Sequence, residues 1–329
     1  MIAPASLIGF GLVFLSVSWG TSLALNAAFL LGRARVRRWG PLAERRSAQL
    51  AVAGPPLLGL VVTAALVAES WFAIVQGYDH CADHAHHLHL CLRHGTNWAA
   101  QAWVLATLAG FGAFTAVHAA QKVAGLWKAR ASLRTLARLA VHASGLPSNT
   151  FVVPANSPFC FTAGLLRPRV FISTAALEQL SPPEQRAALE HEACHVEQAD
   201  VLRRTVLGFL ALLGVPSLPA RSLAAWDVAT ERLCDLCAAG ALGCPTTVAS
   251  ALLILARTNL TALPGATCFA EKSTVEERIE SLLAGEAAGH RAGRWIARVA
   301  LVLAGGLVAV LALHSDPIHH LAETLLALI

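Results

Sequence analysis

The stretch LEHEACHVEQAD, residues 189–200, places two histidines and a glutamate at a spacing that suits metal chemistry. His191 and His195 are four residues apart, so on a helix they project from one face and can bind a single metal ion. Glu192 lies beside them, turned away from direct ligation, and its carboxylate can take the proton of a water molecule that the metal activates. Only three positions define this HExxH pattern, so it needs a further ligand from elsewhere in the chain before it predicts an enzyme.

A second polar stretch, AAWDVATERLCDLCAAG at residues 224–240, supplies two carboxylates that are also four residues apart. A catalytic zinc takes three protein ligands and keeps one position open, which predicts Glu231 as the third ligand. Asp235 follows one turn later and is expected to accept the free ring N–H of a ligating histidine, which would fix that ring's tautomer. Asp200 has two interpretations: it does the same for the other histidine, or it pairs with Arg203 or Arg204.

The elements that must position these residues can also be predicted. Residues Thr150 to Ser173 are rich in Val, Phe, Ile and Thr and are interrupted by Pro and Gly, which indicates two or three short strands. Ser181, Pro182 and Glu184 fit the start of a helix, with a serine N-cap, a proline at the first helical position and a capping-box glutamate. The run from Val201 to Ala220 is too short and too proline-rich for a comfortable span, so it is expected along the inner leaflet or against the membrane helices.

Composition indicates that these elements belong to a membrane protein. The chain has 329 residues, 56% of them hydrophobic and 14% charged, against roughly a quarter charged in a soluble domain. Four blocks are long and apolar enough to cross a bilayer: Leu7 to Leu31, Leu50 to Val75, Trp98 to Ala120, and Trp295 to Leu313. The predicted fold is therefore a mainly α membrane protein. Four transmembrane helices carry a small α+β, zincin-like protease domain between helices three and four.

The distribution of basic residues predicts the orientation. The loop after the first span holds six arginines, and a further group of basic residues follows the third span, so both segments are expected in the cytosol. Both termini would then lie outside a plasma membrane. The predicted division is a three-helix membrane region at 1–121, a cytosolic zinc metallopeptidase domain at 122–294, and the fourth helix with a short external tail at 295–329. The net charge of +5 reflects this topology, and no basic stripe predicts a nucleic-acid partner.

The outward loop at 77–97 is crowded with potential metal ligands. Its imidazoles and thiols suit copper or zinc, but the alternative for the two cysteines, a disulfide closing a solvated loop, is favoured by an oxidising exterior. Both interpretations remain open. The residues concerned are Cys81, Cys91, His84, His86, His87 and His89. On the cytosolic side, Cys194, Cys234 and Cys237 are expected to stay reduced and to pack as small hydrophobic residues.

The motifs HEACHVEQAD and ERLCD, preceded by SPFCFTAGLLRPRVFIS, resemble the cytosolic protease domain of the BlaR/MecR-type membrane zinc metallopeptidases. The resemblance implies that His191, His195 and Glu231 bind one Zn²⁺, that Glu192 is the catalytic base and that Asp235 supports the ligands from behind. It also implies a protein substrate, a dimeric winged-helix repressor of the BlaI/MecI type, often with self-cleavage. The chain ends about sixteen residues after the fourth span, without the penicillin-binding sensor of that family, so β-lactam sensing is not expected.

Two other functions compete with a regulatory zinc endopeptidase. One is a housekeeping membrane protease similar to the Ste24/HtpX group, which shares HExxH and a downstream ExxxD; placement of the domain between spans three and four favours the regulatory enzyme. The other is a non-enzymatic metal-sensing receptor. A structural zinc site would normally be closed by four side chains, and Glu192 would then have no role. In an enzyme, the substrate is expected to pair with an edge strand within Thr150 to Ser173.

Overall fold

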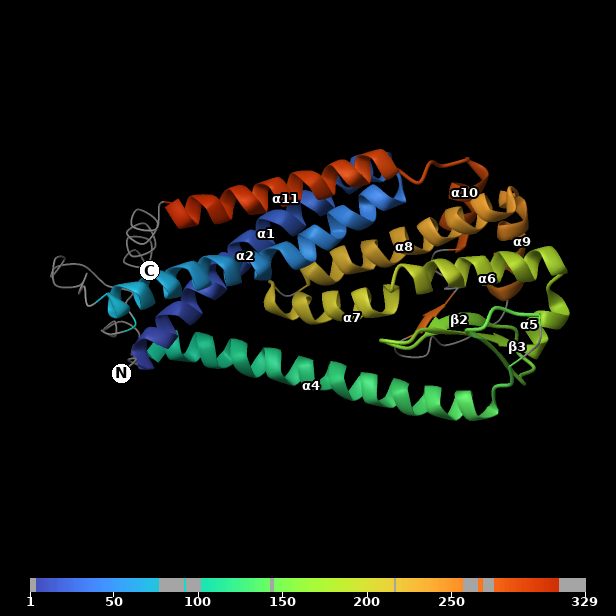
Figure 1. Cartoon of the computed structure of the whole chain (residues 1–329), viewed down its shortest axis with the longest axis horizontal. Coiled ribbons are helices and arrows are strands. Elements are labelled where there is room, and N and C mark those ends of the chain that lie inside the picture. Colours follow the sequence, from blue (N-terminus) through green and yellow to red (C-terminus); the bar gives the residue numbers. More distant parts are fainter. Residues whose placement is uncertain are drawn as a thin grey trace.

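The computed structural model describes residues 4–76, 92, 102–142, 145–215, 217–256, 266–268 and 275–313. Four long helices extend from a smaller domain that contains the sheet and the shorter helices; three of them run side by side, and the third in sequence diverges from them toward the sheet (Figure 1). The amino-terminal end of the first long helix and the carboxyl-terminal end of the last lie at the same end of the molecule, away from this domain.

The four long helices confirm the four predicted apolar segments. They are α1 (Pro4–Arg37), α2 (Pro41–Val75), α4 (Ala102–Leu139) and α11 (His290–Leu313). Each is long and apolar enough to cross a membrane. Such a set of helices is consistent with a multi-pass membrane protein.

Helix α4 extends well beyond the predicted third span, which ended at Ala120. The sequence from Lys122 to Leu139 consists mostly of Ala, Leu, Lys and Arg, which are strong helix formers, and contains no proline. This second half of α4 reaches the sheet, where Leu133 and Leu136 pack against a cluster that includes Phe171. One helix thus contains both an apolar segment and a segment that packs against the sheet of the domain.

The sheet has four strands in the order β1-β3-β2-β4. Three of them confirm the strands predicted between residues 150 and 173: β1 (Thr150–Val153), β2 (Cys160–Ala163) and β3 (Arg169–Ser173). Strand β1 is parallel to β3, and β2 is antiparallel to β3. The fourth strand, β4 (Ala266–Cys268), comes from a distant part of the chain and pairs antiparallel with β2.

The remaining elements are helical. They are α5 (Thr174–Gln179), α6 (Pro182–Glu197), α7 (Asp200–Leu210), the 3₁₀ turn η2 (Ala211–Leu213), α8 (Leu218–Leu242), α9 (Pro245–Ala256) and α10 (Val275–Leu283). The predicted start of α6 is confirmed, since Glu184 Oε2 accepts hydrogen bonds from the backbone N–H of Ser181 at 2.8 Å and from its hydroxyl at 2.7 Å.

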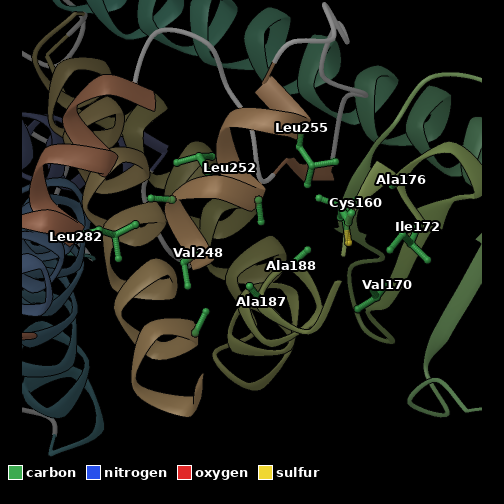
Figure 2. Packing of buried hydrophobic residues seen from close by; sticks show 14 residues of the cluster. Cys160, Val170, Ile172, Ala176, Ala187, Ala188, Val248, Leu252, Leu255 and Leu282 are labelled. Carbon is green, nitrogen blue, oxygen red and sulfur yellow. The ribbon is translucent and has the colours of Figure 1, made fainter. Parts of the chain in front are cut away.

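Helix α6 is fixed between the sheet and the helices α8 and α9. Its buried face carries the small residues Ala187 and Ala188, which allow close packing against Ile172 of β3 and Leu252 of α9 (Figure 2). The stretch from 191 to 195 lies further along the same rigid helix. The orientation of its side chains is therefore set by a close-packed core.

The segment predicted to lie along the leaflet or against the spans adopts the second arrangement. Leu207 of α7 packs in one buried cluster with Phe29 of α1, Val52 of α2 and Trp226 of α8. After η2, the backbone N–H of residue 215 donates to Ser22 Oγ at 3.3 Å. The domain and the long helices α1 and α2 therefore share a hydrophobic core.

A close backbone contact joins the α1–α2 turn to the segment that precedes α11. Leu42 N–H donates to the carbonyl of Ala288 at 3.2 Å. Gly289 has a positive φ of 74°, and a Cβ there would overlap the carbonyl oxygen of Trp39. Glycine is required at this position for both reasons.

Replacing Gly289 with alanine should lower the stability of the chain more than the same change at Gly285. Both glycines have positive φ, so each substitution costs about 1–2 kcal/mol in backbone strain. Only Gly289→Ala also creates a steric overlap, which adds roughly 1–3 kcal/mol, because a Cβ at Gly285 meets nothing within 4 Å. Thermal unfolding of the two purified variants measures the difference, and equal losses would contradict the close contact.

Candidate metal centre

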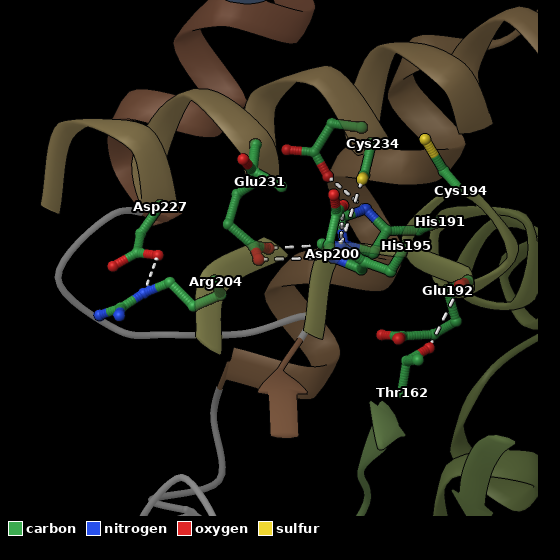
Figure 3. Close-up of polar contacts among 12 residues, drawn as sticks. Thr162, His191, Glu192, Cys194, His195, Asp200, Arg204, Asp227, Glu231 and Cys234 are labelled. Carbon is green, nitrogen blue, oxygen red and sulfur yellow. Dashed lines mark hydrogen bonds and ion pairs between the residues drawn. The ribbon is translucent and has the colours of Figure 1, made fainter. Parts of the chain in front are cut away.

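Helices α6 and α8 bring the two histidines and Glu231 together. The Nε2 atoms of His191 and His195 face one another at 3.1 Å. Glu231 Oε2 lies 3.4 Å from His191 Nε2, and its Oε1 lies 3.4 Å from His195 Nε2 (Figure 3). The histidines are fully buried, whereas the Glu231 side chain is 13% exposed. The sequence-predicted ligand atoms therefore converge on one point.

These separations fit a zinc ion. Four ligands at about 2.0–2.1 Å in a tetrahedron lie about 3.3 Å from one another. The Nε2–Nε2 separation of 3.1 Å is close to this value, and each Nε2 lies 3.4 Å from one of the two Glu231 oxygens. Two imidazoles and one carboxylate are also the donor set of a catalytic zinc site, which leaves one position free for water or substrate. His191, His195 and Glu231 could therefore hold the ion.

A sulfur donor lies close to the same histidines. His191, His195 and Cys234 each offer a candidate ligand atom, and these three atoms lie within 4.8 Å of one another. However, Cys234 Sγ approaches His195 at Nδ1, at 3.5 Å, and this nitrogen faces Asp200 at 2.9 Å. The Nε2 atoms point instead toward Glu231, so the carboxylate is the better third donor.

Glu192 is placed for proton transfer rather than for ligation. It is fully buried on α6. Its backbone carbonyl accepts a hydrogen bond at 3.2 Å from Thr162 Oγ1 of β2, which ties α6 to the sheet (Figure 3). Burial raises the pKa of Glu192, and His195 and His191 only partly offset this effect. A buried carboxylate with a raised pKa can accept and return a proton.

Asp235 lies behind His191, as the spacing predicted. His191 Nδ1 is 3.0 Å from Asp235 Oδ1. The carboxylate is held in turn by Arg278 of α10, whose Nη2 and Nε donate to its two oxygens at 2.7 Å each. Arg278 Nη1 also lies 3.1 Å from Glu231 Oε2. This buried guanidinium therefore fixes both carboxylates of α8.

Asp200 lies behind His195, as Asp235 lies behind His191. Its Oδ2 is 2.9 Å from His195 Nδ1, which favours the histidine-orienting interpretation. The arginine that pairs with its other oxygen is Arg45 of α2, and not Arg203 or Arg204. Arg204 pairs instead with Asp227 at 2.6 Å, on the surface. The alternative prediction, that Asp200 pairs with Arg203 or Arg204, was therefore wrong.

The charges around the site leave an excess of negative charge. Four buried or nearly buried carboxylates face two buried guanidiniums, so two negative charges remain uncompensated when the histidines are neutral. These groups are Glu192, Asp200, Glu231 and Asp235, with Arg45 and Arg278. A divalent cation would neutralise this excess, which is a second respect in which the residues fit zinc.

The pKa shifts have the same physical origin. Burial alone would raise the pKa of Glu231, but Arg278 and His195 outweigh it and hold this pKa well below its usual range. Burial would lower the pKa of His195, but the charge of Glu231 and the hydrogen bond to Asp200 raise it well above its usual value. The raised pKa of His195 shows that the carboxylates favour positive charge at this ligand, and the lowered pKa of Glu231 keeps its side chain in the charged form that binds a metal.

Two arginines of the site, Arg278 and Arg45, were missed by reasoning from the sequence alone. Arg278 is fully buried on the apolar face of α10, four residues before Leu282. Arg45 occupies the same face of α2 as the buried residues Ala48 and Val52. A charged residue at a core position is the signal that could have identified each of them.

Glu44 is a further buried charge that the sequence did not indicate. It is fully buried on α2, accepts from Arg33 Nε at 2.7 Å and from Arg232 Nη1 at 2.8 Å. Arg232, the neighbour of Glu231, also pairs with Glu286. The residues predicted to form an external metal site or a disulfide, Cys81, Cys91, His84, His86, His87 and His89, lie outside the described residues.

Comparison with known proteins supports a peptidase. Residues 126–259, which include all three candidate ligands, match peptidase family M48. M48 peptidases are typically zinc-dependent, so the match supports a zinc metallopeptidase. It does not extend to α1, α2 or α11, and it does not single out the BlaR/MecR type. Neither the curated proteins nor the solved structures contain a match to the chain.

Replacing Arg278 with methionine should strongly destabilise the chain. The change leaves Asp235 and Glu231 buried without their cation, which costs roughly 3–5 kcal/mol. Arg204→Met is the matched control, because its pair with Asp227 is 40% and 36% exposed and contributes about 0–1 kcal/mol. Thermal unfolding of both variants measures the contrast. Equal midpoints would show that Arg278 does not neutralise the carboxylates.

Proposed function

We propose that the chain is an integral-membrane zinc endopeptidase that hydrolyses peptide bonds on the cytosolic side. His191, His195 and Glu231 hold one zinc ion, and Glu192 is the catalytic base. The observation that carries the proposal is the convergence of two Nε2 atoms and a carboxylate beside a buried glutamate. The match to peptidase family M48 over the same residues supports it.

The protein side chains divide the work of hydrolysis. Zinc, when bound, supplies a Lewis acid that activates water and polarises the scissile carbonyl. Glu192 takes a proton from the attacking water and returns it to the leaving amine, which its burial and raised pKa favour. Asp200 and Asp235 keep the imidazoles oriented with Nε2 toward the reaction.

The chain's own strand β4 supports a polypeptide substrate. Substrate was expected to pair with an edge strand within Thr150 to Ser173; β2, one of these strands, is not at the edge, because β4 pairs with it and places Thr162 opposite Thr267. Thr162 is also the residue that contacts the backbone of Glu192. An extended segment paired to β2 therefore lies about 4.8 Å, one strand spacing, from β2. Strand β2 in turn contacts α6, the helix that carries Glu192. Self-cleavage near β4 follows as part of the proposal.

A cavity beside the same strand supports a substrate larger than a few residues. Its volume is about 820 Å³, and it lies between α4 and the β2–β3 hairpin, with Trp127, Ala163 and Leu166 among its walls. Four arginines also line it, so an acidic stretch of substrate would complement its charge. They are Arg130, Arg134, Arg167 and Arg169.

The biological setting is proposed from the layout and the resemblance. The four apolar helices would place the chain in the plasma membrane with both termini outside and the peptidase domain, between α4 and α11, in the cytosol. The substrate would be a winged-helix repressor of the BlaI/MecI type, the chain itself, or both. The partners are thus a protein and the lipid bilayer, with no direct contact to nucleic acid.

Glu192→Gln should abolish cleavage and keep zinc. The amide cannot accept the proton, so cleavage of a co-expressed winged-helix repressor should fall roughly 10²–10⁴-fold. Zinc content should stay at one ion per chain because no ligand has changed. Glu190→Gln, an exposed change on the same helix, is the matched control and should behave as the wild type. Equal cleavage by the two variants would remove Glu192 as the base.

Purified wild-type chain should cleave itself close to β4. Segment 266–268 already pairs with β2, so its peptide bonds need little rearrangement to reach the site. Intact-mass spectrometry of the chain over time measures the fragments and locates the cut, and Glu192→Gln should remain whole. A cut elsewhere, or the same cut in Glu192→Gln, would contradict self-cleavage at this strand while leaving repressor cleavage to its own test.

A further inference from the structure

Arg45 is a fully buried cation on a long apolar helix, and its contacts lead to the candidate metal site. It lies in the first turns of α2, with a side chain that is 2% exposed. One guanidinium nitrogen, Nη2, pairs with Asp200 Oδ1, and the other, Nη1, donates to Gln198 Oε1. The guanidinium also stacks over Trp226 of α8, 5.0 Å from the ring centroid.

We infer that Arg45 is a positioning residue for His195. Asp200 Oδ2 faces His195 Nδ1 at 2.9 Å, so Arg45 holds the carboxylate on one side while the carboxylate holds the imidazole on the other. An N–H at Nδ1 that donates to Asp200 leaves the lone pair on Nε2, which faces His191 and Glu231. The guanidinium thus acts on the ligand atom through one carboxylate.

The second arm of Arg45 fixes the backbone around the same histidine. Gln198 is the C-cap of α6, and its side-chain amide donates to Cys194 Sγ at 3.0 Å. The next residue, Ala199, has a φ of 51°, so the chain turns sharply there into α7 and Asp200. Arg45 therefore contacts both the end of α6 and the start of α7, on either side of this turn.

Arg46, the next residue, shows what a purely structural arginine on α2 does. Its Nη1 donates to the carbonyl of Gly293 at 2.6 Å, which joins α2 to α11. Among the described residues, Arg46 makes no hydrogen bond or ion pair with α6, α7 or α8. Both arginines tie α2 to another part of the fold, but only Arg45 contacts a partner of a candidate zinc ligand.

The inference rests on the proposed zinc site, and it does not require that the chain be a peptidase. Through Arg45, which holds Asp200, α2 is in direct physical contact with the metal centre. This helix is long and apolar enough to span a membrane.

The test compares Arg45→Met with Arg46→Met in the full-length chain in detergent. Zinc affinity is measured by competition with a chelator, and site geometry by the visible absorption of the Co²⁺-substituted chain. Arg45→Met should weaken zinc binding about 10–100-fold and change the Co²⁺ spectrum, as is typical when the partner of a ligating histidine is disturbed. Arg46→Met should change neither, even if it lowers the thermal midpoint. Wild-type affinity and spectrum in folded Arg45→Met would overturn the inference.

A double-mutant cycle keeps the inference testable if Arg45→Met does not fold. Asp200→Asn should weaken zinc binding, and Arg45→Met in that background, which removes both buried charges, should add little further loss because Arg45 acts through Asp200. An unchanged affinity in Asp200→Asn, or a large additional loss in the double variant, would overturn it. These measurements use no substrate, so failure of the Glu192 cleavage test would not affect them.

Discussion

Each of the two histidines is held by a buried carboxylate that is itself held by a buried arginine, and the rest of the structure depends on this arrangement. The two chains of contacts are His191–Asp235–Arg278 and His195–Asp200–Arg45. Removing such charges from water is costly unless each is paired. Both sets of contacts must therefore be intact for the two Nε2 atoms to point at one place. The excess negative charge that remains is what a divalent cation would neutralise.

This constraint explains why parts distant in the sequence pack together. Arg45 comes from α2, before the domain, and Arg278 from α10, near the domain's carboxyl-terminal end, so the orientation of α6 depends on elements far apart in the chain. The shared core of α1, α2, α7 and α8 and the contact between the α1–α2 turn and residue 289 hold these elements in place. The smaller domain is thus attached to the long helices by packing and by buried charge, and not only by chain connectivity.

Most of the candidate site could be predicted from the sequence, because its ligands come in pairs four residues apart on two helices. The four apolar helices and the three strands between residues 150 and 173 were also predicted, since period and composition are local signals. Arg45 was counted only among the six arginines of the predicted cytosolic loop, and β4 was not foreseen. Both depend on contacts between distant segments, which no local pattern reports. The external loop at 77–97 lies outside the described residues, and the substrate stays a prediction.

X-ray absorption at the zinc edge of the full-length chain tests the central claim most directly. The account predicts a first shell of nitrogen and oxygen atoms only, at about 2.0–2.2 Å, with the scattering of two imidazoles. A sulfur at about 2.3 Å would contradict it, because Cys234 would then take the place assigned to Glu231.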